Sequence, residues 1–322
     1  MLFNFVIGFL VGILALLSIV LNFVCLLVMN NTTRMLERPS SYFVINLLVA
    51  DMLQAVSVLP LYILKNYNIS NQFWKGVVCD GFRFSNMITF YVSALGVPLI
   101  ALDRLIGAAC VFQHRFFMKK RIVMIAIITC WIYVLTLCII PFFSSDPPNK
   151  FTDEINNRCI YNPTDAWTLS MLIINCFLPY ILILLSYKYF VKFLRKMKSI
   201  RIIKSNQKIR SDRVRRTNKI AKISILISIC YGVLNGPSVF YYILDTICPE
   251  TCFPRDFKNS LFKRCTEFII KYLAFSNSLA PPLIYCFSHT EFLLRLQSIT
   301  RILKRRKEPA VNNHNAVETT YN

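Results

Sequence analysis

Seven apolar stretches divide this 322-residue chain and restrict what it can fold into. Each is long enough to supply the ~20 residues with which an α-helix crosses the ~30 Å hydrocarbon core of a membrane. A single span in lipid must satisfy its own backbone hydrogen bonds, which favours helices over open strands. The sequence therefore predicts an all-α membrane protein, a bundle of seven transmembrane helices. The expected spans are 3–29, 42–64, 77–111, 122–143, 167–191, 220–245 and 268–287.

Basic residues gather on alternate connections between these stretches, and their distribution predicts the orientation. The segments 30–41, 112–121, 188–222 and 288–322, together with Arg104, hold 27 of the 37 lysines and arginines. Connections rich in lysine and arginine stay on the cytosolic side. We therefore expect a multi-pass protein of the plasma membrane with an extracellular N-terminus. The bundle would occupy residues 1–287, and residues 288–322 would form a short cytoplasmic tail.

The composition fits a membrane protein better than a nucleic-acid-binding one. Hydrophobic residues make up 55% of the chain, and the formal net charge is +21. That charge lies in the expected cytosolic connections, where it meets anionic lipid, and no aromatic residues interleave with it as base-stacking platforms. We expect membrane lipid as a partner and no nucleic acid.

The strongest local signals are polar and charged residues that recur in a fixed order along the seven stretches. They are Asn22, the stretch 46–51, Cys79, Asp103 with Arg104, Trp131, Pro179, Tyr187, Pro237 and the stretch 277–285. From end to end, this order resembles the rhodopsin-like (class A) G-protein-coupled receptors. The resemblance implies a receptor and not an enzyme, which passes the binding of an extracellular ligand to a heterotrimeric G protein. It also implies a short amphipathic eighth helix from about Phe292 onward.

The resemblance assigns activation roles to four residues. Arg104 corresponds to the arginine of the D-R-Y motif, which leaves its neighbour Asp103 on activation and meets the G protein. Tyr187 and Tyr285 correspond to the tyrosines that then close over that arginine. These roles are implied by the family and not by the spacing alone.

Five of the twelve cysteines fall on the expected outer side, where disulfides persist. The resemblance implies a disulfide between Cys79 and Cys159. We expect one further bridge among Cys248, Cys252 and Cys265, which leaves one thiol over. No His/Cys cluster has the spacing of metal ligands.

Several motifs depart from the family pattern. The stretch 281–285 reads PPLIY where N-P-x-x-Y is usual, and Asn235 stands in the place of the aromatic toggle. Leu105 replaces the tyrosine of D-R-Y, and Pro98 should break the third span. These departures favour an orphan or chemosensory-type member. They leave open an atypical receptor that binds its ligand without G-protein coupling.

Asp51 is a carboxylate near the middle of the membrane. Such a group is costly, and it should face polar partners inside the bundle. The candidates are Asn22, Ser93, Asn277 and Ser278. The family places a sodium ion there, with Asp51, Ser93 and Asn277 as its expected surroundings here. The alternative is a hydrogen-bonded polar cluster without an ion.

Three cations converge on the expected ligand pocket and suggest an anionic small molecule. They are Lys65, Arg83 and Lys271, and buried charge needs a partner. Asn86 stands where amine receptors carry an aspartate, which disfavours an amine. The remaining ligand-binding candidates are Tyr62, Trp167, Met171, Asn235 and Tyr242.

Two alternatives compete with the anionic ligand. Glu267 lies four residues before Lys271, the favoured order for a helical ion pair, and acids of the second outer loop could satisfy Arg83. A retinal-binding pigment would use a lysine in the last span. Lys271 lies one helical turn too far out for that role, and Phe275 occupies the matching position.

Overall fold

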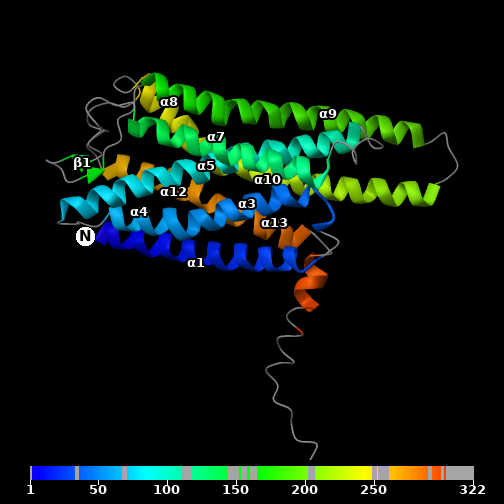
Figure 1. The fold of residues 1–322 in the computed structure, drawn as a ribbon, viewed down its shortest axis with the longest axis horizontal. Coiled ribbons are helices and arrows are strands. Elements are labelled where there is room, and N and C mark those ends of the chain that lie inside the picture. The colour runs from blue at the N-terminus through cyan, green and yellow to red at the C-terminus, as the bar shows by residue number, and fades with distance from the viewer. Residues whose placement is uncertain are drawn as a thin grey trace, which may run out of the picture.

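Seven helical segments run along one common axis and form a bundle in the computed structural model (Figure 1). The structure describes residues 2–32, 36–66, 71–109, 118–143, 152–153, 158–159, 165–201, 207–248, 252, 261–288, 292–298 and 301. The uninterrupted helices are α1 (Leu2–Asn30), α5 (Gln72–Ala109), α7 (Lys120–Phe143) and α10 (Gln207–Ile247). The other three segments change helix type along their length. They are α3 (Ser41–Leu53), η1 (Gln54–Val58) and α4 (Leu59–Lys65); α8 (Asp165–Leu172), η2 (Ile173–Phe177) and α9 (Leu178–Arg201); and α12 (Leu261–Ser276), η3 (Asn277–Leu279) and α13 (Ala280–Ser288).

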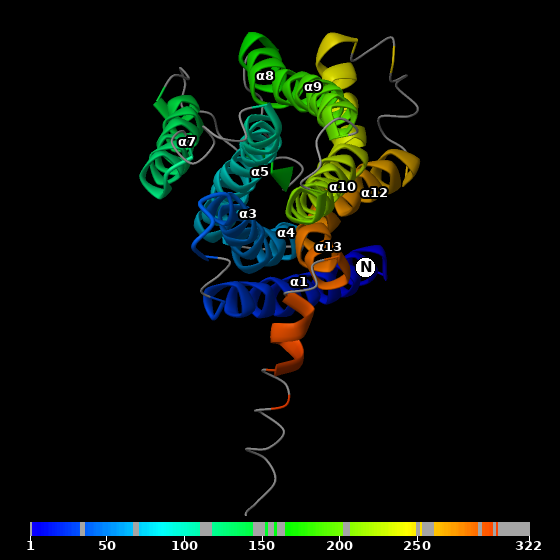
Figure 2. The same cartoon turned by 90° about the vertical axis from the view of Figure 1, so that its right-hand side faces the viewer.

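The helix α5 lies at the centre of the bundle. It contacts α3, α4, α7, α9 and α10, whereas α7 stands at the edge (Figure 2).

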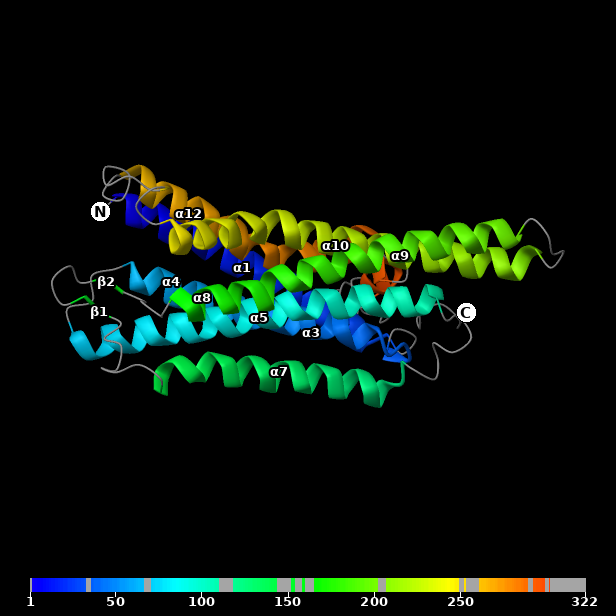
Figure 3. The ribbon, with the colours of Figure 1, turned by 90° about the horizontal axis from the view of Figure 1, so that it is seen from above.

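At the end away from the N-terminus, α9 and α10 extend beyond the other helices (Figure 3). At the opposite end, β1 (Thr152–Asp153) and β2 (Arg158–Cys159) pair antiparallel, with Thr152 opposite Cys159. A short helix at 292–298 turns away from the bundle axis. Its Phe292 is buried in the inner core, the hydrophobic core at the end of the bundle away from the N-terminus. The seven-helix fold with a short eighth helix is thus confirmed.

The bundle carries apolar side chains outward and polar ones inward. Leu16 and Leu184 are 67% and 70% exposed, whereas Ser18, Asn22 and Asp51 are fully buried. Six helical segments of the described residues are long and apolar enough to cross a membrane. The segment from α12 to α13 is divided by the 3-10 turn η3. A surface of this kind suits lipid, with polar groups gathered where helices contact one another.

Prolines act differently in different helices. The prediction that Pro98 breaks the third span was wrong. The helix α5 runs through this buried proline without interruption, and neighbouring helices pack against α5 on several sides. Pro60 and Pro179 instead each follow a π-helical turn, η1 and η2. A proline cannot donate to the carbonyl four residues earlier. The wider π turn accommodates that loss, as in the bond from Leu59 N–H to the Gln54 carbonyl.

The break in the last segment follows from two consecutive prolines. Pro281 and Pro282 cannot donate to the carbonyls of Asn277 and Ser278. The 3-10 turn η3 compensates the first loss, because Ala280 N–H donates to the Asn277 carbonyl. The second carbonyl is satisfied from α1, where Asn22 Nδ2 donates to the Ser278 carbonyl at 2.9 Å. The double proline therefore ties this segment to the first helix.

We expect Asn22→Leu to destabilise the bundle, because the Ser278 carbonyl would be buried without a donor. The loss should be about 1–3 kcal/mol, the usual cost of an unsatisfied buried polar group. Thermal unfolding of the purified protein measures it. Thr136→Val is the matched control, since Thr136 is exposed and donates only within its own helix. Equal melting temperatures for Asn22→Leu and Thr136→Val would contradict this role of Asn22.

Candidate functional site

A cavity of about 480 Å³ lies in the half of the bundle nearest the N-terminus. The side chains around it come from α4, α5, α8, α10 and α12, with Gln54 and Asn277 contributed by η1 and η3. The structure brings together eight of the nine residues predicted to bind ligand: Lys65, Arg83, Asn86, Trp167, Met171, Asn235, Tyr242 and Lys271. Tyr62 lies behind the wall, where its ring packs against Phe82 and Phe275.

The three predicted cations all line this cavity. Arg83 belongs to the central helix α5 and lines the cavity, and only 7% of its surface is exposed. Lys65 Nζ lies 4.0 Å from the ring centroid of Phe82 and 4.8 Å from that of Tyr62. Such cation–π contacts hold an ammonium group at an aromatic face without neutralising it. Lys271 lies near the hydroxyl of Tyr242, close enough for an electrostatic interaction.

The ion pair considered between Glu267 and Lys271 is not formed. Glu267 Oε1 instead lies 3.7 Å from Lys263 Nζ, one turn earlier in α12. It also accepts a hydrogen bond from the Tyr241 hydroxyl of α10 at 3.1 Å. A glutamate in a helix can reach a lysine four residues before it or four residues after it. The hydrogen bond from Tyr241 on the adjacent helix favours the conformation in which Glu267 contacts Lys263. The acids proposed from the second outer loop lie outside the residues whose side chains the structure describes.

The inner end of the cavity is lined by uncharged polar side chains. They are Gln54, Ser93, Asn235 and Asn277, and all four are buried. Asn235 Nδ2 donates to the Tyr231 carbonyl at 3.2 Å, and Gln54 Nε2 approaches the Phe275 carbonyl at 3.5 Å. Sequence reasoning missed Gln54 as a cavity residue. The sequence feature that could have indicated it is Pro60, because the π turn before this proline starts at Gln54.

Asp51 is fully buried on α3, within electrostatic range of Tyr231, which lines the cavity. Neither of its carboxylate oxygens has a hydrogen-bond partner among the residues that the structure describes. Asn22 Nδ2 instead donates to Ser18 Oγ and to the Ser278 carbonyl, while Ser278 Oγ accepts a hydrogen bond from Ser18 Oγ and donates to the Phe275 carbonyl. Asn22 Oδ1 and Ser93 Oγ are likewise buried without a partner in the described part of the chain. Among the described residues, no protein group forms a hydrogen bond with the Asp51 carboxylate, and both the sodium ion and the ion-free cluster stay predictions.

The inner end of α5 holds the charged pair predicted for activation. Arg104 Nη2 lies 2.6 Å from Asp103 Oδ2, and the carboxylate side chain is only 1% exposed. Tyr187 on α9 lies 3.2 Å from Ser228 Oγ of α10, hydroxyl to hydroxyl. Tyr285 is buried in the inner core of the bundle. Leu105, the departure from D-R-Y, packs against Phe190. The activation roles of these residues stay predictions.

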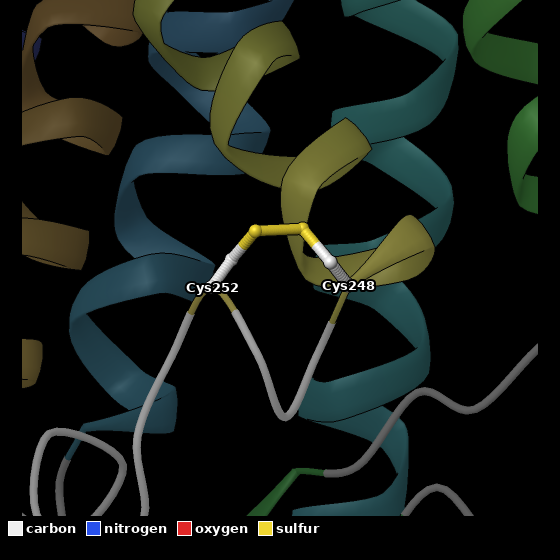
Figure 4. The surroundings of a disulfide bond; sticks show 2 residues. All are labelled: Cys248 and Cys252. Atoms are coloured by element: carbon white, nitrogen blue, oxygen red, sulfur yellow. A yellow bond between two sulfur atoms is a disulfide. The ribbon is translucent and has the colours of Figure 1, made fainter.

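The outer cysteines include two that form a bridge with each other. Cys248, just past the end of α10, is joined to Cys252, and Figure 4 shows the bond between their two sulfur atoms. Cys265 in α12 is a free thiol. Cys79 is also disulfide-bonded. The side chain of Cys159 lies outside the described residues, so the Cys79–Cys159 pairing stays a prediction.

Comparisons with known proteins agree with this architecture. The model of the family described as "7 transmembrane receptor (rhodopsin family)" matches residues 21–285. The alpha-1A adrenergic receptor of Oryzias latipes is 24% identical, over 96% of this chain and 69% of that receptor. The GQ-coupled rhodopsin of Mizuhopecten yessoensis is 22% identical, over 90% of this chain and 58% of that protein. Dopamine receptor 4 of Caenorhabditis elegans is 25% identical, over 58% of this chain and 38% of that receptor. The chain thus spans between 38% and 69% of the length of these relatives.

Proposed function

Because this chain belongs to the rhodopsin family of seven-transmembrane receptors, we propose that it couples an extracellular ligand to a heterotrimeric G protein. It would do so in the plasma membrane, with its N-terminus outside the cell. The observation that carries the proposal is that α5 holds both ends of the pathway. Arg83 lines the cavity, and the Asp103–Arg104 pair lies about 30 Å further along the same helix.

The proposed mechanism is a shift between two packings of the bundle. The ion pair at 2.6 Å holds Arg104 against Asp103 and away from a partner protein. A ligand that binds the outer cavity better in the open packing raises the population of that packing. The hydroxyls of Tyr187 and Tyr285 then approach the released guanidinium. Here α9 and α10 are the natural moving elements, because they extend furthest at the inner end (Figure 3).

The charge of the cavity supports an anionic small molecule as the ligand. Lys65, Arg83 and Lys271 line it, with Asp245 as the acidic residue among the lining side chains. Two relatives are named for dopamine and for adrenergic ligands, but Asn86 stands where amine receptors carry an aspartate. Its amide offers no negative charge to an ammonium group. An anion therefore suits these side chains better than an amine.

A retinal pigment is the less favoured alternative, although one relative is named a rhodopsin. Phe275 occupies the position of the pigment lysine, and its ring is buried against Tyr62. Lys271 lies one helical turn further out, near the hydroxyl of Tyr242. A Schiff base at Lys271 would thus sit away from the pigment position.

We also propose that Asp51 holds a sodium ion. The support is the set of buried oxygens without hydrogen-bond partners in the described residues: both carboxylate oxygens of Asp51, Asn22 Oδ1 and Ser93 Oγ. A hard cation prefers oxygen ligands of this kind, and it would neutralise a buried carboxylate that otherwise costs several kcal/mol. Asn277, the third residue predicted for this ion, lines the ligand cavity from η3 together with Ser93.

Coupling is tested by substituting the two members of the inner pair. Asp103→Asn should raise basal G-protein activation severalfold at matched surface expression, because it removes the charge that holds Arg104. Adding Arg104→Ala to this variant should return the signal to the level of mock-transfected cells. Arg121→Ala, an exposed cation on the same side, is the control. If Asp103→Asn stays at the mock level for every G-protein class, the non-coupling receptor is the better description.

The anionic ligand is tested with a panel of small carboxylates, phosphates and sulfates, each beside its neutral ester. We expect an active acid to lose at least about tenfold in potency when esterified, because the ester lacks the negative charge that attracts the cations of the cavity. Arg83→Gln should weaken the acid by a similar factor. Arg264→Gln should not, since Arg264 is exposed and lies outside the cavity. Esters that act as well as their acids would refute an anion site.

Sodium binding is tested by thermal unfolding of the purified receptor. Replacing sodium chloride by choline chloride at constant ionic strength should lower the wild-type melting temperature by about 2–4 °C. Asp51→Asn should remove this difference, whereas Asp80→Asn, on the outer part of α5, should keep it. A wild-type protein that melts at the same temperature in both salts would exclude an ion that stabilises the fold.

A further inference from the structure

The ligand cavity has two ends of different chemistry. The cations Lys65, Arg83 and Lys271 lie at its outer end, where Asp245 and Thr246 complete the rim. The inner end has no charged side chain among the lining residues that the structure describes. It is formed by Gln54, Ser93, Asn235 and Asn277. Between the two ends, the wall is apolar and aromatic: Met87, Phe90, Met171, Leu172, Val239 and Phe275.

The distance between the ends follows from helix geometry. Arg83 and Ser93 lie on the uninterrupted helix α5, ten residues apart, which corresponds to about 15 Å. Lys271 and Asn277 are six residues apart on the last segment, about 9 Å. Since these residues line one cavity, a single molecule can contact both ends. It must be elongated to do so.

The inner end is built to form hydrogen bonds with a neutral group. Its four side chains are 2–8% exposed, and each can donate or accept. Ser93 Oγ has no hydrogen-bond partner among the described residues. A buried polar group of this kind costs free energy until a partner reaches it. An apolar ligand end would form no hydrogen bond with Ser93, so the free-energy cost of this buried hydroxyl would remain.

The amide of Asn235 is the residue that makes this end polar. It stands in the place where the family usually has an aromatic toggle. A tryptophan there would fill the space with an apolar ring, whereas Asn235 lines the cavity and anchors itself to the Tyr231 carbonyl. The departure thus changes the floor of the cavity from an apolar surface to a hydrogen-bonding one.

We propose that the ligand is an elongated anion whose opposite end carries an uncharged hydrogen-bonding group, such as a hydroxyl or an amide. The acid is held by Lys65, Arg83 and Lys271. The neutral group bonds with Asn235 and Ser93, and an apolar middle contacts the aromatic wall. This inference rests on the proposed anion site and adds a second recognition point, about 15 Å deeper along α5.

Three probes separate the two ends: 10-hydroxydecanoate, decanoate and 1,10-decanediol. Binding is measured as ligand-dependent thermal stabilisation of the full-length receptor in lipid nanodiscs. On the wild-type receptor, 10-hydroxydecanoate should bind about tenfold more tightly than decanoate, because only the hydroxyl satisfies the inner end. In Asn235→Leu, the two acids should bind within about threefold of each other. Ser186→Ala, equally buried but outside the cavity, should keep the wild-type preference.

Each outcome bears on one end of the ligand. Equal wild-type affinity for the two acids overturns this inference and leaves the anion site standing. A diol that binds as tightly as the hydroxy acid overturns the anion site itself. If Asn235→Leu does not reach the nanodisc in folded form, Ser93→Ala takes its place with the same expected loss of preference. A preference that survives in both variants, or no saturable binding of either acid, also overturns the inference.

Discussion

The hydrogen bond from Asn22 to the Ser278 carbonyl is the constraint on which the inner architecture depends. Two prolines free the carbonyls of the last segment, and inside a membrane no water is at hand to satisfy them. The hydrogen bond from Asn22 of α1 satisfies the Ser278 carbonyl, and the 3-10 turn satisfies the Asn277 carbonyl. The break lies between Lys271 and Tyr285. It therefore separates the half of the segment that lines the cavity from the half that packs beside the inner ion pair.

Continuity of α5 is the complementary feature. Pro98 removes one backbone hydrogen bond, yet the helix stays unbroken because neighbouring helices surround it. A continuous α5 connects Arg83 with Arg104 through a single rigid element, while the last segment bends at η3. Movement is therefore expected at the broken segment and at the extended ends of α9 and α10, with α5 as the fixed reference. This division agrees with a shift between two discrete packings.

The fold could be predicted from the sequence because lipid imposes strong rules. Apolar length, loop charge and ordered polar residues indicated the seven helices. Packing of individual side chains was harder to foresee. The break expected at Pro98 did not occur, because tertiary contacts outweigh a local preference. Glu267 contacts Lys263, since Tyr241 of another helix selects between two equivalent neighbours. Gln54 was missed, because the π turn before Pro60 changes which side chain faces the cavity.

The cavity and the proposed sodium site at Asp51 share two side chains, and the proposal therefore has a thermodynamic consequence. Ser93 and Asn277 line the ligand cavity and are also the polar neighbours expected for an ion at Asp51. A ligand group that engages Ser93 changes the oxygen that a cation would use. Linkage then requires that ligand and ion alter each other's affinity by the same factor. In a receptor with an aromatic toggle, a bulky ring would separate the two regions. Here Asn235 is a polar side chain that lines the cavity, and the proposed coupling would pass through Ser93 and Asn277 themselves.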